Sequence, residues 1–171
     1  RSGKAVAEAF DKAGLAGFES LIRSRFEAIP SEERFDRRRW SDVLRAIYLS
    51  QRNPVAYEAL AEQTGLDARD CMALATIFVS RKPDVALAWV DRGIDLERTT
   101  PHGSGAGYDL GRLRRELLTR LGRGDEALDA AWVEYRKNPS KFSFDDVMKV
   151  VPKADRAAWR EKALNAAKGA D

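Results

Sequence analysis

The chain has 171 residues, of which 44% are hydrophobic and 33% are charged. A chain of this length can form one domain that buries roughly 70% of its unfolded surface, so its core needs neither a metal nor a disulfide. The 30 basic and 27 acidic residues leave a net charge of only +3, which is weak evidence for nucleic-acid binding. No apolar run reaches the roughly 18–20 residues that span a bilayer.

The single cysteine, Cys71, cannot form a disulfide within the chain, and the N-terminal residues do not form a secretory signal. We therefore expect a cytoplasmic protein that is not inserted in a membrane. Because the sequence does not begin with Met, we also expect it to be a segment of a longer protein.

Apolar residues recur every three or four positions along almost the whole chain, which predicts an all-α fold. Residues 4–28 are expected to form one or two helices, with a break at residues 14–17 and a stop at Pro30. The next helix carries an apolar stripe within residues 40–47 and is expected to end close to Pro54.

A short helix over residues 55–64 is expected to end at Gly65, since glycine favours the conformation that terminates helices. Asp67 can then cap a helix that runs to Arg81. Pro83 opens the following helix, because proline is compatible with the first helical turn.

Residues 99–107, with the sequence TTPHGSGAG, form the only long segment rich in helix breakers. We interpret it as a connection between two helical halves of one helical-repeat domain, residues 1–171. Beyond it we expect helices on both sides of a turn at residues 122–124, then a helix capped by Ser140 and a last helix after Pro152. The total is eight to ten helices.

A shift of 41 residues aligns Ala86 with Ala127 and Leu87 with Leu128, so that a helix, a tight turn and a second helix occur twice. Tetratricopeptide repeats have a period of about 34 residues, and HEAT-like repeats one of about 40–47. The pattern therefore indicates a helical repeat.

The segment LGRGDEALDAAWVEYRKNP, residues 121–139, is similar to the second half of a tetratricopeptide repeat. Gly122 permits a tight turn between helices, and the small residues Ala127 and Ala131 allow close helix approach. The resemblance implies an α-solenoid, a stack of antiparallel helix pairs.

The motifs GDEA, NPS and PKADRAAW lie within residues 124–159. With them, residues 69–89 and 114–163 resemble an uncharacterised bacterial helical family, the DUF6880 type, and the helical regions that accompany SWIM zinc-finger domains. The resemblance implies the fold and no particular activity, because the metal-binding residues of a SWIM finger are absent here.

No group of residues indicates catalysis or a cofactor. His102 is the only histidine and lies in the glycine-rich segment, while Cys71 lies on a helix that we expect to be buried. One cysteine and one histidine cannot form a dedicated zinc site. Residues 103–107 lack the preceding strand and the lysine of a phosphate-binding loop. We therefore expect a protein without enzyme activity, cofactor or metal.

Arginines gather before Trp40 and again after the glycine-rich segment. If Arg37, Arg38, Arg112 and Arg115 converge, they can bind an acidic peptide or phosphates by bidentate contacts. The alternative is that they lie on solvated helix faces and pair with nearby carboxylates.

The leading hypothesis is a non-catalytic interaction or scaffold module that binds a protein or peptide partner in a concave groove. The alternative is a nucleic-acid-associated helical module that binds phosphates through its arginine clusters. The sequence leaves the oligomeric state open, since exposed terminal helices would either dimerise or contact other domains.

Overall fold

A computed structural model describes residues 11–30 and 33–168, which contain nine α-helices, one short 3₁₀ helix and no strand. The all-α prediction is therefore confirmed. The helices are α2 (Lys12–Ala28), α3 (Arg34–Ser50), α4 (Pro54–Thr64), α5 (Ala68–Phe78), α6 (Pro83–Thr99), α7 (Gly107–Arg120), α8 (Gly124–Lys137), α9 (Lys141–Val150), η1 (Lys153–Asp155) and α10 (Arg156–Lys168). None of these helices is long and apolar enough to cross a membrane.

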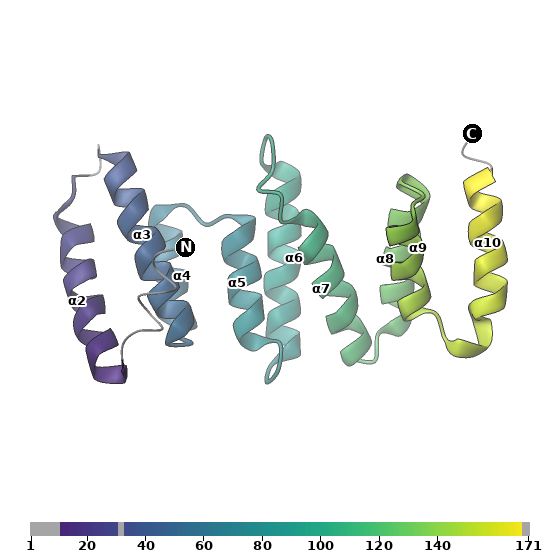
Figure 1. Ribbon diagram of the computed structural model, residues 1–171, viewed down its shortest axis with the longest axis horizontal. Coiled ribbons are helices and arrows are strands. Elements are labelled where there is room, and N and C mark those ends of the chain that lie inside the picture. Colours follow the sequence, from purple (N-terminus) through teal and green to yellow (C-terminus); the bar gives the residue numbers. More distant parts are fainter. Residues whose placement is uncertain (1–10, 31–32, 169–171) are drawn as a thin grey trace.

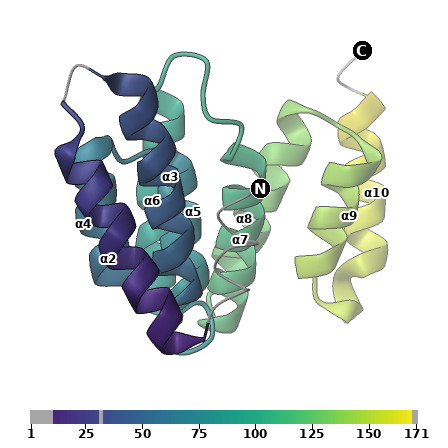
Figure 2. The ribbon, with the colours of Figure 1, turned by 60° about the vertical axis from the view of Figure 1, so that its left-hand side comes forward.

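The helices follow one another in chain order along the long axis of the molecule (Figure 1). The most extensive contacts between helices all join neighbours in sequence. Figure 2 shows α2, α3 and α4 grouped at one end and α9 and α10 at the other. The chain is thus built from local helix packing.

The hydrophobic core is divided into three clusters along this axis. The first lies between α2 and α5 and includes Ile47, the second lies between α5 and α9 and includes Leu117, and the third lies between α8 and α10 and includes Val147. Trp89 packs against the first two clusters, and Val150 packs against the last two. These two side chains therefore connect the clusters.

The helix ends follow the local chemistry that the sequence predicts. Asp67 and Ser140 each form a capping box at the start of α5 and α9, and Pro83 occupies the first turn of α6. Helix α5 ends at Phe78 and not at Arg81, because the amides of Arg81 and Lys82 both donate to the Phe78 carbonyl and close a turn.

The predicted break at residues 14–17 is wrong, since α2 continues through both Gly14 and Gly17. Each helical glycine costs about 1 kcal/mol relative to alanine. Burial of a large apolar side chain contributes about 1.5–3 kcal/mol, and this helix buries Ile22 and Phe26 in the first cluster. Tertiary packing therefore outweighs the glycine propensity. The part of the expected helix before residue 11 lies outside the described residues.

The 41-residue shift corresponds to two successive helical hairpins, α5–α6 and α7–α8. Helix α6 begins at Pro83 and α8 begins at Gly124, which lies 41 residues later. Gly122 has a φ of +74°, a conformation that glycine adopts without strain, in the tight turn of the second hairpin. The glycine-rich connection joins α6 to α7, and both helices contribute to the second core cluster.

Gly93 marks a close approach of α6 to its neighbours. A Cβ atom at this position would lie 2.9 Å from the Cβ of Cys71 and 3.1 Å from both Cδ atoms of Leu110. We predict that Gly93→Ala lowers the free energy of unfolding by about 1–3 kcal/mol, because the buried neighbours must shift. Urea denaturation followed by circular dichroism measures this change.

The matched control is Gly17→Ala, at a helical position where, apart from the neighbouring backbone of α2 itself, no described heavy atom lies within 4 Å of the new Cβ. This substitution should raise the free energy of unfolding by about 0.5–1 kcal/mol through helix propensity. Equal stability of the G93A and G17A proteins would contradict the close packing of α6.

Candidate functional site

A polar cleft of about 930 Å³ lies where α3, α4 and α5 meet. Its lining comes from one face of α3, from Tyr57 near the start of α4 and the C-terminal end of the same helix, from the connection that follows it and from the first turn of α5. The lining residues are Arg37, Arg38, Ser41, Asp42, Arg45, Tyr57, Gln63, Thr64, Gly65, Asp67, Arg69 and Asp70.

An ion pair between the half-buried Arg45 of α3 and the buried Asp70 of α5 forms the floor of the cleft. The Nε atom of Arg45 lies 2.8 Å from Oδ1 of Asp70, and Nη2 lies 3.3 Å from Oδ2. The two side chains are only 15% and 6% exposed. Such a bidentate contact fixes orientation as well as distance, so it sets the position of α5 against α3.

Further hydrogen bonds extend this pair to α4. Nη2 of Arg45 donates to Oγ1 of Thr64 at 2.8 Å, and Nη1 donates to the hydroxyl of Ser41 at 3.1 Å. The Tyr57 hydroxyl donates to Oδ1 of Asp70 at 2.8 Å. We call these five residues the Arg45 network. Within the described part of the chain, no buried side-chain polar atom lacks a hydrogen-bond partner.

The local sequence explains how Asp70 reaches this position. The side chain of Asp67 accepts from the amides of Arg69 and Asp70, and the Asp70 carboxylate accepts from the amide of Asp67 at 3.1 Å. This capping box places the Asp70 carboxylate at the N-terminus of α5, where the helix dipole favours negative charge.

The network also determines the protonation of its members. Burial disfavours the charge of Arg45, but the hydrogen bond and the charge of Asp70 outweigh that cost, so the pKa of Arg45 lies above its ordinary value. Burial raises the pKa of Tyr57, and the adjacent Asp70 carboxylate raises it further. The phenol therefore stays protonated at neutral pH and acts as a hydrogen-bond donor.

The rim of the cleft carries charges of both signs. Arg38 is exposed and makes no ion pair with a described residue. Arg69 lies 3.7 Å from Asp67, and its side chain is 65% exposed. Asp42 is also 65% exposed. The Arg37 guanidinium is less available to a ligand, because it donates to the Ile29 carbonyl and lies over the ring of Phe26.

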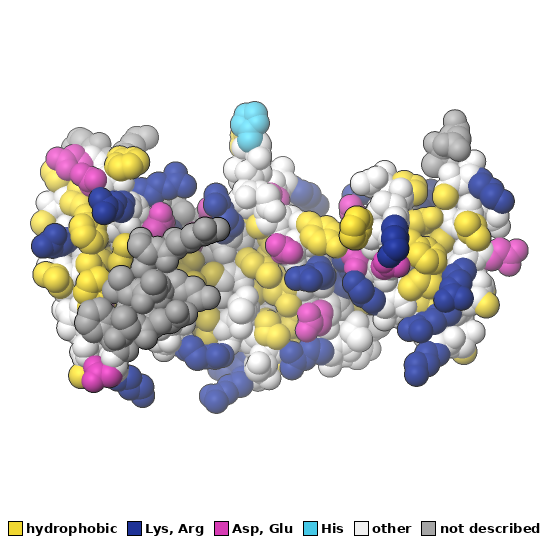
Figure 3. Space-filling view, in the orientation of Figure 1, with side chains coloured by type: hydrophobic (Ala, Val, Ile, Leu, Met, Phe, Trp, Pro, Cys, Tyr) yellow, Lys and Arg dark blue, Asp and Glu magenta, His cyan; other side chains and the backbone are white. Residues whose placement is uncertain are grey.

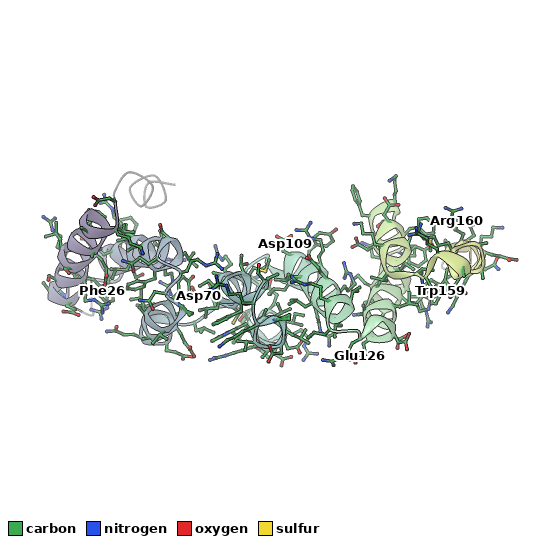
Figure 4. All side chains as sticks on the ribbon, turned by 90° about the horizontal axis from the view of Figure 1, so that it is seen from below. Phe26, Asp70, Asp109, Glu126, Trp159 and Arg160 are labelled. Carbon is green, nitrogen blue, oxygen red and sulfur yellow. The ribbon has the colours of Figure 1, made fainter. Side chains whose placement is uncertain are left out.

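The four arginines singled out from the sequence do not line one site. Arg37 and Arg38 line the cleft, whereas Arg112 and Arg115 lie on α7 and contribute nothing to its lining. Arg115 is buried and contacts Asp146 at 2.7 Å. Arg112 forms an ion pair with Asp109 on its own helix, α7. Figure 4 shows Asp109 apart from Asp70, which lies on α5 at the cleft.

Sequence reasoning missed Asp70 and Tyr57. The sequence does contain a signal for the α3 wall of the cleft, namely the spacing of Arg38, Asp42 and Arg45. This spacing places three charged side chains on one face of α3, beside its apolar stripe. Nothing in the local sequence identifies Asp70 as their neighbour, because its contact with Arg45 spans 25 residues.

The glycine-rich connection already holds an anion, the carboxylate of Glu97. The backbone amides of Ser104 and Gly105 donate to this carboxylate at 2.8–3.0 Å, and the Ser104 hydroxyl donates at 2.6 Å. The pKa of Glu97 lies below its ordinary value, chiefly because the carboxylate accepts a hydrogen bond from the Ser104 hydroxyl and also because it accepts one from the Ser104 amide. His102 lies on the exposed part of this connection, with a φ of +68°.

Within residues 11–30 and 33–168, no three His, Cys, Asp or Glu side chains form a group that could hold a metal ion. Comparisons of this chain with protein-family models, with curated proteins and with solved structures give no match. The interpretation of the cleft therefore depends on its own chemistry.

Tyr57→Phe tests the Arg45 network with little change in volume. Loss of the hydrogen bond to the buried Asp70 carboxylate should lower the free energy of unfolding by about 1.5–3 kcal/mol. The control is Tyr108→Phe, since Tyr108 is 60% exposed and its hydroxyl makes no hydrogen bond to a described residue. The control should change stability by less than about 0.5 kcal/mol, and an equally small effect of Y57F would contradict the network.

Cys71 is fully buried, and burial raises the pKa of its thiol to about 11. We predict that the native thiol reacts with a disulfide reagent near pH 8 at least about 100-fold more slowly than the thiol of the urea-unfolded chain, because the reactive thiolate is both scarce and inaccessible. Absorbance of the released thiolate measures both rates. Native and unfolded rates within a factor of about three would show that α5 does not bury Cys71.

Proposed function

We propose that this chain is a non-catalytic helical module that binds a protein or peptide partner in the cleft formed by α3, α4 and α5. In this proposal its antiparallel hairpins form a tetratricopeptide-like α-solenoid, as the resemblance of residues 121–139 implies. The observation that carries the proposal is a large cleft with a fully hydrogen-bonded floor and exposed arginines at its rim.

The floor of the cleft favours binding over chemistry. Asp70 accepts hydrogen bonds from Arg45, from Tyr57 and from the amide of Asp67, so its lone pairs are occupied. A general base needs a free lone pair within reach of a substrate proton. The raised pKa of Tyr57 likewise opposes its use as a nucleophile or base. These groups are therefore suited to holding the walls in place.

The rim favours a polypeptide over a nucleic acid. Arg38 and Arg69 can pair with carboxylates or backbone carbonyls of a peptide, while Asp42 and Asp67 can accept from its amides or its cationic side chains. The same two carboxylates would repel the phosphate groups of a nucleic-acid backbone.

The arginine clusters give little support to the nucleic-acid alternative. Arg114 contacts Asp91 at 2.7 Å, Arg115 contacts Asp146 at 2.7 Å, and Arg123 contacts Glu126 at 2.7 Å. Figure 3 shows Lys and Arg side chains spread along the face in view, among Asp and Glu side chains, and not gathered in one patch. Nucleic-acid binding that is driven by counterion release needs unpaired cationic side chains placed along the phosphate backbone.

The test is site-specific photo-crosslinking in lysate, with and without nuclease. A benzophenone side chain replaces Gln63, which is exposed and lines the cleft, and the same side chain at Val133 of α8 serves as the control position. We predict a nuclease-resistant crosslink to protein from position 63 and a much weaker one from position 133.

The crosslink from position 63 should fall at least about five-fold when Arg38 and Arg69 are both changed to Glu. The control variant carries the same charge change at Arg98 and Arg120, which lie outside the cleft lining, and should retain the crosslink. Nuclease-sensitive crosslinks would favour the nucleic-acid alternative, and equal yields from both positions would remove the cleft as the binding surface.

A further inference from the structure

A second groove, distinct from the cleft, lies at the other end of the molecule between α8, α9 and α10. It has a volume of about 460 Å³ and an almost entirely apolar lining. Phe144 of α9 forms one wall, and Ala163, Leu164 and Ala167 of α10 form the other. Apolar grooves of this size are within the range of specific binding sites, roughly 300–1,000 Å³.

The groove is held open by contacts that fix α10 at a distance from α9. The Tyr135 hydroxyl donates to the Ala163 carbonyl at 2.8 Å, and Trp132 meets Trp159 edge to face with centroids 5.3 Å apart. The ammonium of Lys162 on α10 lies 4.7 Å from the centroid of the Trp132 ring on α8. Helix α10 is therefore anchored on one side by α8, and Figure 4 shows Trp159 and Arg160 pointing to different sides of α10.

The groove side of α10 exposes apolar surface that no described residue covers. Leu164 is 61% exposed although it lines the groove. The small side chains of Ala163 and Ala167 leave space between the two helices. A helix laid along the groove would remove this apolar surface from water, which favours binding.

The charge around the groove selects the type of helix that fits. The α10 sequence contains one acidic residue, Glu161, and four basic ones: Arg156, Arg160, Lys162 and Lys168. Arg160 lines the groove and forms no ion pair with a described residue, whereas Lys141 at the α9 wall is paired with Asp145 at 2.7 Å. A second copy would bring its own basic α10 toward this one, whereas an acidic partner is attracted. A flat anionic membrane does not match a concave groove.

We propose that the α9–α10 groove binds an amphipathic helix of a partner protein, which inserts an apolar stripe between Phe144 and Leu164 and places an acidic side chain against Arg160. The apolar residues of such a helix recur at positions i, i+3 or i+4, and i+7. This inference does not depend on the cleft, because the groove shares no lining residue with it.

The probe is a phage-displayed library of helical peptides in which the apolar-face and flanking positions are randomised, selected on the immobilised whole chain. We predict that enriched peptides combine the apolar stripe with Asp or Glu at the flanks. Fluorescence anisotropy then gives the Kd of the enriched peptide for the wild-type chain and for four variants.

Leu164→Gln should weaken binding about ten-fold or more, and Arg160→Glu about five-fold or more. The controls are Val133→Gln and Arg156→Glu, which make matched changes at exposed positions outside the groove lining and should leave Kd within about two-fold. Circular dichroism verifies that all four variants keep their helix content.

Three outcomes would overturn the proposal. One is the absence of any enriched peptide, and another is enrichment of peptides with basic flanks. The third is an enriched peptide whose Kd is the same for the groove variants and the controls. Binding of the chain to vesicles of anionic phospholipid, lost in L164Q and R160E while no peptide is enriched, would assign the surface to a membrane instead. The Arg38 and Arg69 variants should bind the peptide normally, which separates this test from that of the cleft.

Discussion

The ion pair between Arg45 and Asp70 is the contact on which the candidate site depends. It joins α3 to α5, and Thr64 and Tyr57 connect α4 to the same two side chains. Because the contact between α4 and α5 is the least extensive between neighbouring helices before α9, polar bonds there supplement modest apolar packing. Without them the walls of the cleft would have no fixed separation, and Arg38 and Arg69 would lose their defined positions at its rim.

The sequence predicts the helices of this protein well, because their ends depend on local chemistry. The caps at Asp67 and Ser140 and the first-turn proline at Pro83 all act within a few residues. The mistaken break in α2 has a different origin. Two glycines weaken that helix locally, but Phe26 packs against residues from later helices, and this contribution is not visible in the local sequence.

The candidate site is less predictable for the same reason. The sequence identifies Arg37 and Arg38, which do line the cleft, from their position before Trp40, a segment that forms the first turns of α3. It does not show that Arg115 contacts Asp146, 31 residues away, or that Asp70 contacts Arg45. Such pairs are set by the order and tilt of the helices. A cluster of arginines in the sequence therefore does not distinguish a binding surface from a buried ion pair.

A double-mutant cycle on the free energy of unfolding tests most directly whether one ion pair organises the cleft. Arg45→Met and Asp70→Asn should each cost about 3–5 kcal/mol, because each leaves a buried polar partner without its counterpart. The double variant should be more stable than the sum of the single effects implies, by about 2–3 kcal/mol. Additivity within about 0.5 kcal/mol would show that the two side chains act independently, and would contradict this account of the cleft.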